Sequence, residues 1–119
     1  MIYKLIIKDF KIIAKHGLLP IEKIEAQEFV VNVIVETKFE SDYADIDKLP
    51  ANKCYAEIRE EIIKIFHAET KNTIEHLAYK ICQKILSDCE NRESVELSIM
   101  KSKLLKDCEV GINLKLTRD

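Results

Sequence analysis

The chain has 119 residues, 47% of them hydrophobic and 34% charged, with a formal net charge of −2 at pH 7. This composition predicts one globular domain, residues 1–119, and excludes a disordered chain. The small negative net charge gives no reason to expect nucleic acid or an anionic membrane as a partner. No apolar run approaches ~20 residues, so no transmembrane helix is expected. The four cysteines form no CxxC pair and no HxH or HExxH motif occurs, so we expect no zinc site, and reduced cysteines in the cytoplasm.

Two strands are predicted in the first forty residues. Residues 2–14 combine β-branched and apolar side chains with spaced charges, and residues 28–40 alternate between an apolar and a polar face. The connection between them, within AKHGLLPIEKIEAQEF, holds Gly17 and Pro20 in a chain that has only two glycines and two prolines. It is long for a hairpin loop, and long loops often carry function.

The hydrophobic period then changes twice. Apolar residues recur at helical spacing over residues 55–66 and 74–85, with Pro50 suited to the start of the first helix and Asn72 or Thr73 to the cap of the second. Strict alternation returns over residues 95–100 and 110–117. The order β-β-α-α-β-β predicts an α+β fold with both helices on one face of an antiparallel sheet, and oligomerisation would cover the open face and edges.

Four polar residues admit a functional interpretation beside a structural one. Glu75 fits a capping box begun by Asn72, but a carboxylate in a first helical turn also suits an amidine-like edge. Lys101 shares the face of Val95, Leu97 and Ile99, where it either extends to water or, if desolvated, serves in proton transfer.

The other two candidates also have ordinary explanations. Tyr55 begins the apolar stripe of the first helix, which favours a place in the core. Glu22 follows Pro20 and has the pattern of a solvated surface acid. His16, beside Gly17, is expected to be a surface or turn histidine.

An ordered set of motifs joins these residues. HGLLPIE-(x)4-QEFVVNV is followed by DYADIDKLPANKCYAEI, TIEHLAYKI, VELSIMK and VGINLKLTR. In order and spacing, over residues 3–118, the set resembles the dihydroneopterin aldolase family of folate biosynthesis. The resemblance implies the tunnelling fold, with subunits that assemble as homo-oligomeric rings, a tetramer or an octamer, around a barrel. It implies active sites between neighbouring subunits and a reaction that needs neither a metal nor another cofactor.

The implied reaction is a retro-aldol cleavage of 7,8-dihydroneopterin, often accompanied by epimerisation to dihydromonapterin. By position, Glu75 matches the glutamate that grips the pterin amino group and ring N–H, helped by backbone groups around Ile74. Lys101 matches the catalytic lysine, which in the family acts through water in proton transfer. Tyr55 matches the tyrosine that assists protonation of the enol-type intermediate. Glu22 matches the glutamate near the side-chain hydroxyls, where it could also pair with the lysine.

Two departures from the family pattern keep alternatives open. Ser102 stands where the family usually has proline, and Lys103 and Lys106 make the segment basic. Extra positive charge suits a phosphorylated substrate, so a dihydroneopterin triphosphate epimerase is one alternative. A non-catalytic ring-forming protein that binds a pterin or purine is another.

Overall fold

The computed structural model describes residues 1–38, 47 and 55–119. The elements are, in chain order, β1 (Ile2–Ala14), α1 (Pro20–Ile24), β2 (Gln27–Lys38), α3 (Tyr55–Ala68), α4 (Ile74–Asp88), β3 (Arg92–Lys101) and β4 (Val110–Thr117). The predicted order of four strands and two long helices is confirmed. The one-turn helix α1 was not predicted; it begins at Pro20, whose missing N–H costs nothing in a first helical turn. Residues 39 and 40 of the predicted strand, and Pro50, lie outside the described residues.

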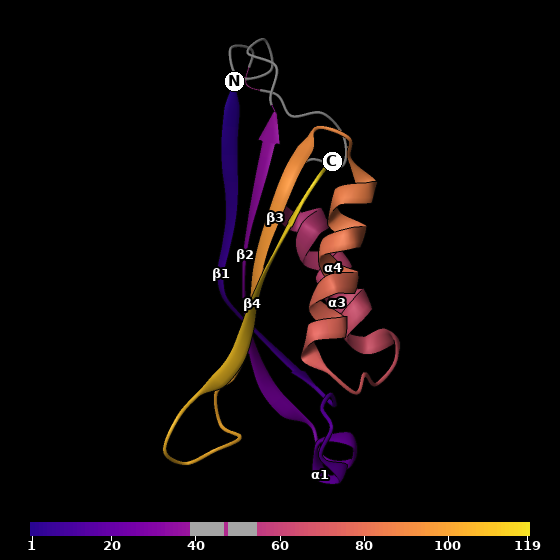
Figure 1. The fold of residues 1–119 in the computed structure, drawn as a ribbon, viewed down its shortest axis with the longest axis vertical. Coiled ribbons are helices and arrows are strands. Elements are labelled where there is room, and N and C mark those ends of the chain that lie inside the picture. The colour runs from indigo at the N-terminus through magenta and orange to yellow at the C-terminus, as the bar shows by residue number, and fades with distance from the viewer. Residues whose placement is uncertain (39–46, 48–54) are drawn as a thin grey trace.

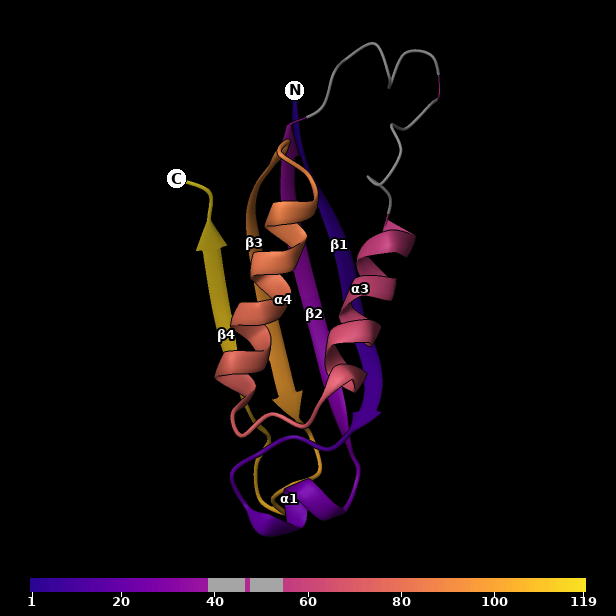
Figure 2. The same ribbon diagram turned by 90° about the vertical axis from the view of Figure 1, so that its right-hand side faces the viewer.

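The four strands form one antiparallel sheet in the order β1-β2-β3-β4. Figures 1 and 2 show α3 and α4 side by side on a single face of this sheet. Helix α3 contacts β1, and α4 contacts β3 and β4. The predicted α+β architecture is therefore confirmed.

The core lies between the sheet and the two long helices. On β2 the alternate residues Phe29, Val31, Val33 and Val35 are fully buried, as the period of two predicts. The stripe of α4 that faces them consists of Ile74, Leu77, Ala78, Ile81 and Ile85.

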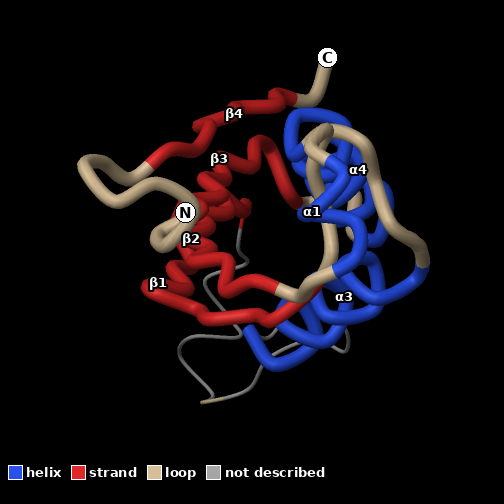
Figure 3. The backbone as a smooth tube through the Cα atoms, turned by 90° about the horizontal axis from the view of Figure 1, so that it is seen from below, coloured by secondary structure: helices blue, strands red, loops and turns tan. Residues whose placement is uncertain are grey.

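Among the described residues, no helix covers the second face of the sheet, as the view along the strands shows (Figure 3). On β1 it presents Ile2, Ile6 and Ile13, each about 60% exposed or more. Asp9, with φ 55°, stands at the irregularity in the pairing of β1 with β2, and its N–H donates to Asn32 Oδ1 at 2.8 Å. Exposed apolar side chains gathered on one face are typical of surfaces that contact a partner.

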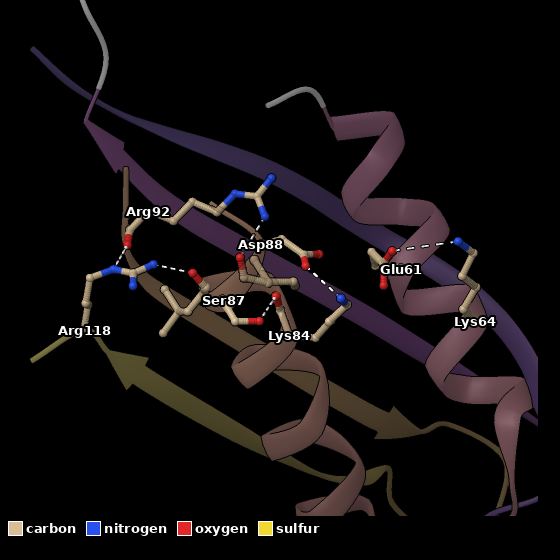
Figure 4. A network of polar contacts seen from close by, with 9 residues as sticks. Glu61, Lys64, Lys84, Ser87, Asp88, Arg92 and Arg118 are labelled. Carbon is tan, nitrogen blue, oxygen red and sulfur yellow. Dashed lines mark hydrogen bonds and ion pairs between the residues drawn. The ribbon is translucent and has the colours of Figure 1, made fainter. Parts of the chain in front are cut away.

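Two arginines close the C-terminal end of α4 (Figure 4). Arg92, which is 4% exposed, donates to the carbonyl of Ile85 at 2.7 Å. Arg118 donates to the carbonyls of Leu86 and, at 2.9 Å, Cys89. The last turn of a helix leaves its carbonyl groups unpaired and favours cations, so these bonds tie β3 and the end of the chain to α4.

Candidate active site

A pocket of about 360 Å³ opens at the opposite end of α4. Its walls come from the loop before α1, the start of α4, the end of β3 and the start of β4, which meet at the lower end of Figure 2. The pocket brings together four of the five predicted site residues, namely Glu22, Ile74, Glu75 and Lys101. A volume of this size suits a small organic molecule.

Glu22 and Lys101 form a buried ion pair in this pocket. Lys101 Nζ lies 2.6 Å from Glu22 Oε2, and the two side chains are 12% and 3% exposed. The ordinary interpretations of these residues, a lysine that extends to water and a surface acid, are therefore wrong. The two residues are 79 positions apart in the sequence, and they meet because α1 lies beside the end of β3.

Gln27 completes the surroundings of the Glu22 carboxylate. Its amide donates to Glu22 Oε2 at 2.9 Å, and the Leu19 N–H donates to Oε1 at 3.2 Å. Burial raises the pKa of Glu22, but the hydrogen bonds from Lys101 and Gln27 outweigh it and the pKa lies below its ordinary value. The group is thus an ionised carboxylate at neutral pH, held in one orientation. The sequence pattern did not single out Gln27.

Gly17 makes room for that carboxylate. Its φ is +143°, a backbone conformation that favours glycine, and a Cβ at this position would overlap the carboxyl group of Glu22. The glycine of the loop is therefore required by its close approach to the Glu22 carboxyl group and by its own conformation.

Substitution Gly17→Ala is expected to destabilise the fold by about 1–3 kcal/mol, because of its φ and the displaced carboxylate. Urea unfolding measures the change. The same substitution made together with Glu22→Ala should cost less, because the overlapping group is then absent. An equal cost in both backgrounds would show that the contact between Gly17 and Glu22 is unimportant.

The first turn of α4 forms the facing wall. Thr73 is the N-cap, and its hydroxyl accepts the N–H of His76 at 3.1 Å. The capping box from Asn72 to Glu75 is therefore wrong by one residue: Glu75 occupies the second helical position and is exposed at the pocket. Ile74 is buried beneath it, 6% exposed. An exposed carboxylate beside unpaired N–H groups leaves donors and acceptors open to a ligand.

Tyr55 is not brought to this pocket within the chain. It begins α3, whose other end lies near the site, where the carbonyl of Phe66 contacts His16. At 1.5 Å per residue Tyr55 lies about 16 Å along the helix from Phe66. The side chain is 65% exposed, so the core position expected from its place in the apolar stripe is wrong.

His16 is buried, 1% exposed, and the expectation of a surface histidine is also wrong. Its ring packs against Phe29 and Phe66, with centroid distances of 5.7 and 5.5 Å. Both ring nitrogens have backbone partners, Nε2 at the Phe66 carbonyl and Nδ1 at the Lys71 N–H. Aromatic neighbours far along the chain explain why the local sequence gave no sign of this burial.

The loop after Lys101 carries the two departures from the family pattern. Ser102 has a buried Oγ for which no hydrogen-bond partner is found among the described residues. Lys103 and Lys106 are exposed. In the part of the chain that the structure describes, no cluster of three or more His, Cys, Asp or Glu side chains suits a metal ion, and no helix is long and apolar enough to cross a membrane.

Comparison with known proteins gives a consistent result. The sequence profile of the dihydroneopterin aldolase (FolB) family matches residues 5–115. The chain is 30% identical over 95 residues to the dihydroneopterin aldolase of Streptomyces coelicolor, a match that spans 80% of this chain and 78% of that protein.

Two solved structures show a similar fold. The dihydroneopterin aldolase of E. coli in complex with neopterin has a TM-score of 0.79 at 18% identity, over 96% of this chain and 98% of that one. The dihydroneopterin aldolase of Burkholderia thailendensis bound to guanine has a TM-score of 0.74 at 17% identity, over 99% and 93%. At such low identity these two likenesses concern the fold alone.

Proposed function

Because the chain belongs to the dihydroneopterin aldolase family, whose members are carbon–carbon lyases, we propose that it cleaves 7,8-dihydroneopterin. The products are 6-hydroxymethyl-7,8-dihydropterin and glycolaldehyde. One observation carries the proposal: a single pocket holds an open carboxylate, Glu75, opposite a buried ammonium–carboxylate pair, Lys101 and Glu22. The first suits recognition of the pterin, and the second suits proton transfer.

The reaction requires the protein to move protons and little else. Loss of a proton from the hydroxyl on the carbon that becomes the aldehyde lets the carbon–carbon bond break. The released electron pair enters the ring imine, whose nitrogen gains a proton. Protonation of the carbon that stays on the ring, with loss of the proton from the ring nitrogen, gives the hydroxymethyl product. The substrate thus supplies its own electron sink, so positioning and acid–base catalysis suffice.

Each residue has one role in this scheme. Glu75 accepts hydrogen bonds from the 2-amino group and a ring N–H of the pterin, with help from backbone groups at Ile74. Guanine would require similar hydrogen bonds from a carboxylate, and the related protein from Burkholderia thailendensis binds guanine. Lys101 exchanges a proton with the ring nitrogen through water, while Glu22 holds the ammonium in place and lies near the side-chain hydroxyls.

The test is incubation with 7,8-dihydroneopterin in the presence of a chelator, followed by separation of the products. Release of glycolaldehyde together with the hydroxymethyl pterin is the expected result. Recovery of unchanged substrate would refute the proposal. Appearance of dihydromonapterin beside the cleavage products would add epimerisation to the activity.

The triphosphate of dihydroneopterin belongs in the same experiment. Lys103 and Lys106 are exposed on the loop that follows Lys101, and positive charge there is the feature that favours a phosphorylated substrate. Asp107 and Glu109 follow directly in the sequence and offset this charge, which is why cleavage of the free pterin is the first proposal. Epimerisation of the triphosphate without cleavage would reverse the order.

A second copy of the chain completes the active site in this proposal. The support is the sheet face that no helix of the described residues covers, with its exposed isoleucines, and the exposed position of Tyr55 far from the pocket of its own chain. Tyr55 of one subunit then assists protonation at the pocket of its neighbour, in a cytoplasmic ring of four or eight single-domain subunits.

Mixing two inactive variants tests this arrangement. Tyr55→Phe and Lys101→Ala, co-expressed with different tags and purified as mixed oligomers, are expected to recover about one quarter of the wild-type activity. In about one quarter of the sites, Tyr55 comes from a Lys101→Ala subunit and Lys101 from a Tyr55→Phe subunit, so that both functional side chains are present. Mixed oligomers no more active than the separate variants would place both residues on one subunit.

A further inference from the structure

His16 joins the two walls of the candidate pocket. On one side, the Lys71 N–H donates to His16 Nδ1 at 3.0 Å, and the Gly17 N–H donates to the Lys71 carbonyl at 3.0 Å. Lys71 lies in the turn between α3 and α4, two residues before the Thr73 cap. This reciprocal pair of bonds fixes where α4 begins, and hence where Glu75 stands.

The backbone of the same residue reaches the opposite wall. The carbonyl of His16 accepts from the Gln27 amide at 3.3 Å, and that amide also donates to Glu22 Oε2 at 2.9 Å. Glu22 in turn holds Lys101. One buried residue is therefore linked through its ring to the Glu75 wall and through its carbonyl to the Glu22–Lys101 pair.

The protonation state of the ring follows from its partners. A backbone N–H can only donate, so Nδ1 must accept from Lys71, and Nε2 carries the proton and donates to the Phe66 carbonyl at 2.8 Å. Burial lowers the pKa of His16, whereas the hydrogen bond to the Phe66 carbonyl raises it. The charges of His67, Lys71 and Lys101 lower this pKa further. Two carboxylates are linked to these contacts, Glu22 beyond Gln27 and Glu69, which pairs with the ammonium group of Lys71.

We propose that His16, in its neutral form, is a positioning residue that sets the spacing between the Glu75 wall and the Glu22–Lys101 pair through the Lys71 N–H. The role rests on the proposed pterin function of the pocket. It differs from a packing role because it depends on one acceptor atom, Nδ1. A packing role would require only a ring-sized side chain between Phe29 and Phe66.

Two amide substitutions separate the two nitrogens. In His16→Asn the side-chain oxygen lies near the place of Nδ1 and still accepts from Lys71, whereas in His16→Gln the amide nitrogen replaces Nε2 and donates to Phe66. Titration with neopterin is expected to show a Kd raised about tenfold in His16→Gln, the scale of one buried donor left unpaired, and little changed in His16→Asn. Equal affinities, or equal losses, in the two folded variants would overturn the proposal.

A second measurement is made on the wild-type protein and requires no ligand. Amide hydrogen exchange at Lys71 should be protected at pH 7.5 and lose protection only below pH 6.5, the ordinary histidine pKa, as the pH falls through the lower pKa of folded His16. Folding favours neutral His16, so this stabilisation is complete above the pKa of the unfolded histidine and is lost as the pH falls through the pKa of the folded one; His16→Asn should not show the change. Unaltered protection of the wild-type Lys71 amide would overturn the proposal even if His16→Gln fails to fold.

These two measurements also distinguish failure of the proposal from failure of the proposed function. If the wild type neither binds neopterin nor cleaves dihydroneopterin, the function is wrong, while the exchange at Lys71 still decides whether His16 holds the turn. If the wild type is active and the exchange is insensitive to pH, the positioning role alone is wrong.

Discussion

Lys101→Ala is expected to lower kcat by roughly 10²- to 10⁴-fold, the usual contribution of a positioned acid–base group, while neopterin still binds. The reason lies in the geometry of the pocket. Lys101 is the ammonium group held at 2.6 Å by Glu22, and Glu75, on the facing wall, is untouched by the change. Steady-state kinetics with dihydroneopterin and a separate neopterin titration measure the two effects.

A loss of folding would imitate a loss of chemistry, so the stability of the variant must be measured. Removing one member of a buried ion pair typically costs about 3–5 kcal/mol, because the other charge is left without a partner. The double variant Glu22→Gln/Lys101→Ala removes that charge and should recover part of the stability. Activity that returns with the stability, or undiminished turnover in Lys101→Ala, would contradict a catalytic role for the lysine.

The fold could be predicted because its elements follow local patterns. The alternation from Phe29 to Val35 decides which face of β2 is buried, and the helical spacing of Ile74, Leu77 and Ile81 decides the face of α4. Such signals need only neighbours within one turn or one pair of strand positions. Helix α1 has a single turn, too short for a period, and it was missed.

The site was harder to predict because its contacts join distant segments. His16 and Glu22 both resembled surface residues, and their burial depends on Phe66 and Lys101, 50 and 79 residues away. Gln27 was missed because the predicted strand began one residue later; the same period of two, continued back from Phe29, places its amide on the buried face of β2, where a buried amide needs partners. The resemblance to the family motifs, and not the local pattern, brought Glu22 and Lys101 forward and implied that the two could pair, as the structure shows.

For substitutions of Glu75 we expect a large loss of neopterin binding while the fold stays intact. Glu75→Ala is expected to raise the Kd for neopterin by roughly 10²- to 10⁴-fold, because two charge-assisted hydrogen bonds of about 1.5–3 kcal/mol each would be lost. Glu75→Gln keeps an acceptor without the charge and should fall between Glu75→Ala and the wild type. Isothermal titration calorimetry with neopterin measures the Kd of all three proteins.

The fold should tolerate these changes, so a loss of neopterin affinity would not result from unfolding. Thr73, not Glu75, caps α4, and Glu75 is exposed, so the free energy of unfolding should change by less than about 1 kcal/mol. Glu90→Gln, the same change of charge in the exposed turn after α4, is the matched control and should leave the Kd unaltered. Wild-type affinity in Glu75→Ala would exclude this carboxylate as the pterin anchor, whereas equal weakening in the Glu90 control would reduce its effect to the overall charge of the protein.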